Sequence, residues 1–214
     1  MNVFWEHGYE ATSTDDLLRA MGIGRQSMYD AFGDKHRLYL EALQLYETEI
    51  GSELFGRVTR APSPFVALCD HVLSVAEGSS LDLSRGCFYV NATTELAQSD
   101  PDVGAMVRAS GARCVAAFEE ILKEAKRRGE VDPSVDERVA ANFLLNTIRG
   151  LRVSAKAGVP PDDLRGIAGR QIEQAEDDDR HDRHHRDGHQ DASNRVDQHL
   201  GHPSRPRQVL AMFQ

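Results

Sequence analysis

The chain has 214 residues, of which 40% are hydrophobic, and its 25 basic and 34 acidic side chains give a formal net charge of −9. This length supports one or two domains with a sizeable apolar core, and the acidic balance excludes a general basic coat for nucleic acid while leaving room for a local basic patch. No apolar run approaches the ~18 residues of a membrane span and no secretory leader is visible, so we expect a cytoplasmic protein that does not contact the membrane.

The first 40 residues predict three short helices. Ser13 or Thr14 is placed to cap the second helix, whose first turn carries two aspartates, and carboxylates favour the positive N-terminal end of a helix. Residues 21–24, Met-Gly-Ile-Gly, predict a tight turn, and residues 25–31 predict the third helix. A glycine-bearing turn between two short helices is typical of a helix-turn-helix motif.

The third helix is predicted to turn one apolar face inward through Met28, with Ile23 and Phe32 beside it. Its outward face then carries side chains that form hydrogen bonds: Arg25, Gln26, Ser27, Tyr29 and Asp30. In the major groove of DNA, arginine pairs with guanine and glutamine with adenine, while hydroxyl groups and helix N-terminal amides contact phosphates. The pattern therefore predicts a helix that reads DNA.

Downstream of this segment, apolar residues recur at helical spacing and no strand-like alternation occurs. Prolines and glycines separate the apolar stretches, which we expect to form helices over residues 35–57, 64–77, 87–97, 101–128 and 135–157, with a last helix starting near Asp162. The segment between the second and third of these stretches, residues 78–86, is predicted as a loop. The expected fold class is all-α, with a three-helix head on a helical body.

Residues 4–40 resemble the DNA-binding domain of TetR-family transcriptional repressors. The matching elements are the G-Y-x-A-T-S entry, the D-D-L-L-x-A-M-G-I turn, the S-M-Y-x-x-F helix and the G-D-K exit, in order and without a gap. Residues 85–97 are similar to the sixth-helix region of one TetR-like subgroup. The resemblance implies a helix-turn-helix DNA-binding domain over 1–40 and a helical ligand-binding and dimerisation domain over 41–169.

The same resemblance implies a homodimer that pairs through its last two helices, Val135 to Ala157 and the helix from Asp162. This dimer would bind double-stranded operator DNA and be released by a small-molecule effector. The implied phosphate contacts are Ser13, Thr14, Tyr29 and Lys35, and the implied base contacts are Arg25, Gln26 and Ser27.

The effector is expected among the C-terminal helices, where polar groups in apolar surroundings can orient a ligand. The polar candidates are Asn91, Glu95, Asn146 and Arg149. The apolar candidates are Cys69, Val72, Phe88, Phe118 and Phe143.

Two features of the head depart from the family pattern. The chain begins inside the first helix, so we expect either that the natural start lies upstream or that the copy is defective. Residues 1–60 hold six basic and ten acidic side chains, so non-specific attraction to phosphates is expected to be weak. Asp30 stands on the reading face, where it either accepts a hydrogen bond from cytosine or repels phosphate.

The composition changes after about residue 169. Residues 170–214 are rich in Asp, Arg and His, and Ala192 is the only hydrophobic residue between positions 176 and 194, so we expect a disordered tail. A frameshift near Gly169 would explain the loss of apolar periodicity. The rival hypothesis is a metal-binding tail through His181, His184 and His185, and we favour a frameshifted or solvated tail over it.

The enzyme class is disfavoured because the sequence holds no Gly-rich phosphate loop, no G-x-S-x-G, no H-E-x-x-H and no paired cysteine motif. Cys69, Cys87 and Cys114 are widely spaced and indicate buried thiols in a reducing compartment rather than a disulfide or metal site. We predict a repressor without cofactor or metal. The alternative is a helical ligand-binding and dimerisation remnant that no longer binds DNA.

Overall fold

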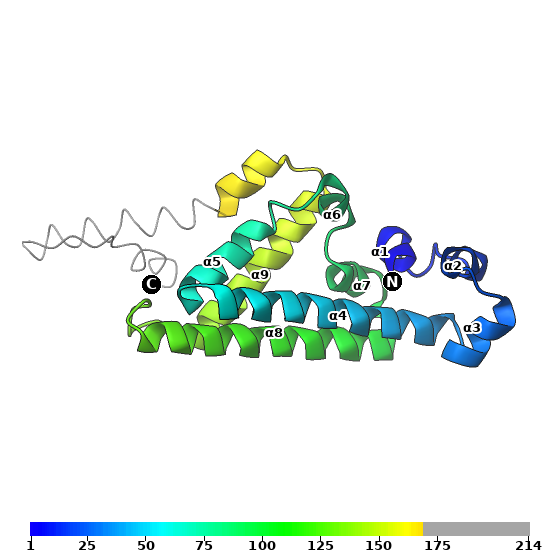
Figure 1. The fold of residues 1–214 in the computed structure, drawn as a ribbon, viewed down its shortest axis with the longest axis horizontal. Helices are drawn as coiled ribbons and strands as arrows, with labels where there is room; N and C mark the ends of the chain where they lie inside the picture. Colours follow the sequence, from blue (N-terminus) through cyan, green and yellow to red (C-terminus); the bar gives the residue numbers. More distant parts are fainter. Residues whose placement is uncertain (169–214) are drawn as a thin grey trace, which may run out of the picture.

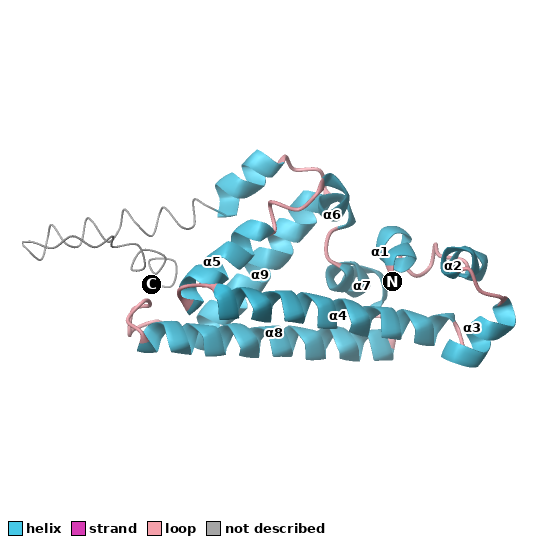
Figure 2. Cartoon of the chain, in the orientation of Figure 1, coloured by secondary structure: helices cyan, strands magenta, loops and turns pink. Residues whose placement is uncertain are grey.

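The computed structural model describes residues 1–168, and all regular elements in that range are α-helices (Figure 2), which confirms the predicted all-α class. The helices of the head are α1 (Asn2–His7), α2 (Thr14–Met21) and α3 (Arg25–Phe32). The body consists of α4 (Lys35–Arg60), α5 (Pro64–Ser74), α6 (Ser80–Arg85), α7 (Phe88–Leu96), α8 (Pro101–Arg127) and α9 (Glu137–Lys156), followed by helical residues 161–168. None of these described helices combines the length and apolar character needed to cross a bilayer. Residues 169–214, to which the predictions of a disordered, frameshifted or metal-binding tail refer, lie outside the described residues.

Two long helices, α4 and α8, run side by side along the molecule (Figure 1). The helices α5 and α9 cross them at one end, and α1, α2 and α3 gather toward the opposite end of α4. Because α8 packs against α5, α7 and α9, it is the central support of the body. The helix predicted to read DNA, α3, stands at the tip of the molecule, far from α5.

A cap and an apolar wedge position the helix-turn-helix. Ser13 is the N-cap of α2: its hydroxyl accepts from the Asp16 amide, and the Asp16 carboxylate accepts from the Ser13 amide in return. Met28 of α3 is 0% exposed and packs in one core with Phe4 and Leu17. The predicted inward orientation of Met28 is confirmed, and it leaves the opposite face of α3 to solvent.

The head has no core separate from that of the body. One cluster of buried side chains runs from α1, α2 and α3 through α4 to α7, and it includes Phe4, Met28, Tyr39, Tyr46 and Phe88. The Phe88 ring meets the Tyr39 and Tyr46 rings edge-on, at centroid distances of 5.5 and 5.8 Å. Since the predicted boundary at residue 40 falls inside α4, the head and the body share both a helix and a core.

One predicted loop is partly helical. Residues 78–86 contain α6, which begins after the N-cap Ser79 and ends at Gly86. The Ser79 side chain accepts from the Asp82 amide. Six residues are too few to display a helical apolar period, so the local signals for this helix are its boundaries: the capping Ser79, Asp82 in the first turn and Gly86 after the last turn.

A substitution at Gly104 tests how closely α7 and α8 approach each other. It is buried in α8, and a Cβ atom there would lie 2.7 Å from the carbonyl oxygen of Ala97 at the end of α7. Gly104→Ala is therefore expected to destabilise the fold by about 1–3 kcal/mol in urea unfolding. The matched control is Gly51→Ala in α4, where nothing lies within 4 Å of the added Cβ, and the loss of a mid-helix glycine should stabilise by about 0.5–1 kcal/mol. Equal effects at the two positions would contradict the close approach.

Candidate DNA-binding surface and effector cavity

The outward face of α3 is open to solvent. All side chains predicted to form this face are exposed: Arg25, Gln26, Ser27, Tyr29 and Asp30. Because α3 stands at the end of α4 (Figure 1), a groove of duplex DNA can reach this face. The residues assigned to base contacts therefore share one accessible surface, and their contacts with DNA remain a prediction.

Two side chains assigned to bases have acidic partners. The Arg25 guanidinium donates to the Asp15 carboxylate, and Gln26 Nε2 donates to Asp30 Oδ1 at 2.8 Å. The Arg25 and Asp15 side chains are 54% and 69% exposed, and such exposed ion pairs contribute little stability. Exchange of either aspartate for another partner, as the predicted base contacts require, would therefore cost little stability.

The residues assigned to phosphates differ in their contacts. Ser13 uses its hydroxyl within the capping box, both as donor and as acceptor, so the start of α2 would meet a phosphate with its first backbone amides. Thr14 is the half-buried first residue of α2. Lys35 places its ammonium 4.3 Å from the centre of the Tyr9 ring, a cation–π contact that keeps the charge beside the head.

Glu95, which was predicted from the sequence to bind an effector, instead forms hydrogen bonds with the backbone of the head. Its two carboxylate oxygens accept from the backbone amides of Tyr9 and Glu10, at 3.1 and 2.9 Å. Gly8 has a φ of +83°, and a Cβ atom there would lie 2.9 Å from Glu95 Oε2. Because residue 8 has no side chain, the Glu95 carboxylate of α7 can approach and accept hydrogen bonds from the backbone that connects α1 to α2.

Trp5 ties α1 to the body at a second point. Its indole Nε1 donates to the Gly86 carbonyl at 3.2 Å, and its ring packs edge-on against Tyr46 at a centroid distance of 5.0 Å. Beside it, Glu6 pairs with Arg85 of α6 at 3.2 Å. The start of the chain is therefore fastened to α4 and α6 as well as to α7.

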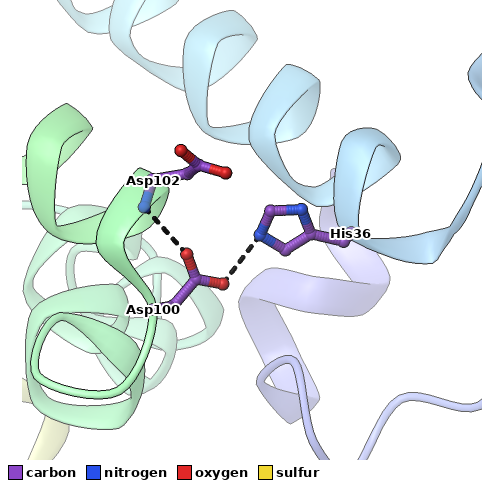
Figure 3. Close-up of side chains that lie close together, drawn as sticks. All are labelled: His36, Asp100 and Asp102. Carbon is purple, nitrogen blue, oxygen red and sulfur yellow. Dashed lines mark hydrogen bonds and ion pairs between the residues drawn. The ribbon is translucent and has the colours of Figure 1, made fainter.

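His36, Asp100 and Asp102 lie close enough to offer ligand atoms to one metal ion, all within 4.8 Å of one another (Figure 3). His36 Nε2 of α4 is 2.7 Å from Asp100 Oδ2, and Asp100 Oδ1 caps α8 by accepting from the amides of Asp102 and Val103. Burial acts to raise the pKa of the Asp100 carboxyl, but hydrogen bonds from Val103 and His36 hold it below its ordinary value. These contacts account for the cluster as a structural link between α4 and α8.

A cavity of about 650 Å³ lies between α4, α5, α7, α8 and α9. Its volume falls in the range of small-molecule sites. Much of its wall is apolar, from Ile50, Leu54, Phe118, Ile121 and Leu145 among others. Of the nine residues predicted to bind an effector, Phe118 and Arg149 line this cavity.

The other apolar candidates lie elsewhere in the body. Phe88 belongs to the core that joins the head to α4, and Val72 belongs to a core between α5 and α9. Cys69 packs against a third core, and Phe143 is 38% exposed on α9. The helical spacing of apolar residues predicts which side chains face the interior, but it does not distinguish a cavity wall from a packed core.

The other polar candidates make structural contacts. Asn91 donates to the carbonyl of residue 85 and accepts from Lys156, which links α7 to α6 and α9. Asn146 is exposed and donates to the carbonyl one turn earlier in α9. Asn91, Asn146 and Glu95 do not line the cavity, and Asn91 and Glu95 instead connect α7 to other segments.

The cavity holds polar groups that the sequence analysis did not single out. Glu47 accepts two hydrogen bonds from the Arg113 guanidinium, at 2.8 and 2.7 Å, and one from the Tyr89 hydroxyl at 3.1 Å. The Arg113 hydrogen bonds hold the pKa of Glu47 below its ordinary value. His71 is 8% exposed, and its Nδ1 has no hydrogen-bond partner among the described residues. Burial lowers the pKa of His71 to about 4, so its ring is neutral near pH 7.

Two family models match the chain: "Bacterial regulatory proteins, tetR family" over residues 1–42, and "Tetracyclin repressor-like, C-terminal domain" over residues 65–166. The HTH-type transcriptional repressor ComR of Escherichia coli is 32% identical over 174 residues, which cover 79% of this chain and 81% of ComR. The uncharacterized HTH-type transcriptional regulator YezE of Bacillus subtilis is 30% identical over 167 residues, which cover 77% of this chain and 86% of YezE. A solved structure of a cysteine mutant of the TetR family transcriptional regulator CifR, in complex with a 26-bp double-strand operator DNA, is 29% identical with a TM-score of 0.70. That match covers 78% of this chain and 88% of the CifR chain.

The Asp30 carboxylate is expected to weaken DNA binding, because it repels phosphates and engages Gln26. Asp30→Ala should raise affinity for a random-sequence duplex about threefold in fluorescence anisotropy at low salt, the effect of removing one like charge ~6 Å from a phosphate in water. The control Glu77→Ala removes the same charge from an exposed side chain of the body and should have no effect. A loss of affinity restricted to sites with cytosine at one position would instead assign Asp30 to base reading.

Proposed function

The chain belongs to the TetR family of bacterial transcriptional regulators, and we propose that it is a repressor that binds operator DNA as a homodimer and is released when a small molecule fills the cavity. The observation that carries the proposal is the exposed face of α3, which presents Arg25, Gln26 and Ser27 at the tip of a head matched by the tetR family model. Its relative ComR is named a transcriptional repressor, and CifR was solved on operator DNA. Since bacterial DNA lies in the cytoplasm, the proposal places the protein there.

In this proposal α3 enters the major groove. Base edges are met by Arg25, Gln26 and Ser27, while phosphates are met by Tyr29, Lys35 and the start of α2 at Ser13 and Thr14. The exposed pairs of Arg25 and Gln26 with aspartates support this arrangement, since they hold both side chains outside the core until a base replaces the partner.

The second copy is proposed to pair through α9 and the helical residues 161–168. Val139 and Val153 of α9 are 61% and 52% exposed, and Ile167 is 42% exposed. Val139 and Val153 are 14 residues apart, which is close to four turns, so they lie on one face of α9. The helix packs against α8 with another face, and pairing of two copies would cover the exposed valines.

The helix α7 connects the cavity to the head. Tyr89 and Thr93 line the cavity, while Glu95 of the same helix grips the connection between α1 and α2. A molecule that displaces α7 on entering the cavity therefore displaces the head. A small displacement is sufficient for release, because both copies of α3 must fit major grooves ~34 Å apart at the same time.

The alternative function is that of a ligand-binding protein that no longer binds DNA. The excess of acidic over basic side chains in residues 1–60 favours it, because it weakens the attraction of the head to phosphates. A measurement of operator binding distinguishes the repressor from a ligand-binding protein that does not bind DNA.

The first test is an anisotropy titration of the purified full chain against the intergenic DNA upstream of its own gene, at low and moderate salt. Lys35→Ala is expected to weaken binding to all sequences and to reduce the slope of log affinity against log salt concentration by about 1, because one phosphate contact is lost.

Gln26→Ala is expected instead to relax base preference at one position in a binding-site selection. Size-exclusion chromatography shows whether each variant is a dimer. A dimeric protein without specific DNA binding would overturn the repressor proposal in favour of the alternative.

Glu95→Gln tests the link between α7 and the head. It is expected to lower operator affinity about fivefold, since a carboxamide offers one acceptor oxygen where the carboxylate offers two, and a hydrogen bond is worth about 1 kcal/mol. Hydrogen exchange at the amides of Tyr9 and Glu10 should accelerate by a similar factor. Glu77→Gln, which removes the same charge from an exposed side chain, should change neither quantity. Unaltered hydrogen exchange at the amides of Tyr9 and Glu10 in Glu95→Gln would show that the hydrogen bonds to Glu95 do not stabilise the head.

A further inference from the structure

The charges that line the cavity do not balance. Three guanidinium groups face one carboxylate, since the charged lining residues are Glu47, Arg113, Arg149 and Arg152. Glu47, the only acid among the described lining residues, is fully engaged: Arg113 donates to both of its oxygens, and Tyr89 donates to one of them. This leaves the charges of Arg149 and Arg152 uncompensated at a largely apolar wall.

Arg149 and Arg152 are neighbours on one face of α9, three residues apart. Both are half-buried, and within residues 1–168 neither forms an ion pair or a side-chain hydrogen bond. Arg149 reaches toward α8, where its Nη2 lies 2.9 Å from the position of a Cβ atom on Gly111. Arg152 lies near His71, whose pKa it helps to lower after the larger effect of burial. Withdrawing unpaired cations from water is costly, and an anion between the two would offset that cost.

His71 adds a second, independent sign of a ligand. Its ring lines the cavity, it is more than nine-tenths buried, and its Nδ1 has no partner among the described residues. Buried polar atoms in folded proteins nearly always have a hydrogen-bond partner. The ring is neutral near pH 7, so it offers a ligand oxygen a hydrogen bond without adding charge.

The remaining wall suits an apolar body. Ile50, Leu54, Phe118, Ile121 and Leu145 surround the cavity from α4, α8 and α9. A volume of about 650 Å³ has room for a chain or ring system much larger than a bare anion. The site thus combines excess positive charge on α9 with a large apolar compartment.

We propose that the effector is a hydrophobic carboxylic acid, which binds as its anion with the carboxylate at Arg149 and Arg152 and the apolar body against the α4 and α8 side of the cavity. The binding site itself does not depend on the repressor function. Its consequence for DNA rests on the proposed repressor function.

Binding is tested without DNA, on the full chain at pH 7. Octanoate and decanoate are titrated against octan-1-ol and decan-1-ol, which have the same apolar chains without the charge. Heat of binding gives the affinity, and fluorescence of Trp5 reports occupancy because its ring contacts Tyr46, which lines the cavity. We expect each acid to bind at least about tenfold more tightly than its alcohol, the effect of charge-assisted hydrogen bonds.

Variants assign that preference to α9. Arg149→Met and Arg152→Met should each lower decanoate affinity about tenfold while decanol affinity changes less than about twofold, because methionine keeps the apolar stem and removes the charge. Arg108→Met, at an exposed arginine of α8 that does not line the cavity, removes the same net charge and should change neither. Urea unfolding of each variant separates loss of the site from loss of the fold.

Three results would overturn the inference: alcohols that bind as tightly as the acids, an equal loss in Arg108→Met, or decyl phosphate binding far more tightly than decanoate. Operator DNA is added afterwards. Decanoate that binds through Arg149 and Arg152 but leaves an operator complex intact supports the site and contradicts release by the effector. An operator complex in a protein that binds no acid supports the repressor and contradicts the site.

Discussion

The packing of Phe88 against Tyr39 and Tyr46 joins the two working parts of this molecule. A head of about forty residues buries too little apolar surface to be stable alone, and here its core is completed by side chains of α4 and α7. Edge-on aromatic pairs add to the energy of burial and restrict the relative orientation of the helices. Because α4 and α7 also form walls of the cavity, the position of α3 depends on the same helices that a ligand would touch.

Charge is distributed in opposite senses at the two ends of this arrangement. The head is acidic, and its exposed Arg25 and Gln26 side chains contact aspartates, so long-range attraction contributes little to an encounter with DNA. The cavity has a surplus of guanidinium groups in apolar surroundings, where each charge acts more strongly than it would in water. The acidic head and the arginine-rich cavity therefore differ in electrostatic character within one chain.

The sequence was sufficient for most of the fold because the helix boundaries are local. Ser13, Pro64 and Pro101 mark helix starts, and the inward position of Met28 follows from spacing alone. The helix α6 was missed because it is too short to show a period.

The cavity could not be derived in the same way. Its residues converge from five helices, and the partners of Glu95 and Trp5 lie 81 to 86 positions away in the chain. Nothing local distinguishes Glu95, which orients the head, from Arg149, which lines the cavity. The pairing of Glu47 with Arg113, 66 positions apart, is likewise visible only once α4 and α8 lie together.

The solvent-facing side of α3 has a consequence for divergence between gene copies. Arg25, Gln26, Ser27 and Asp30 are exposed and carry none of the core, so substitutions there change the chemistry of this surface without loss of packing. Parts of the cavity wall lack this freedom, because α4 and α7, which contribute to it, also support the head. Substitutions in the cavity wall that shift α4 or α7 therefore disturb the head as well, whereas substitutions on this face of α3 have only local effects.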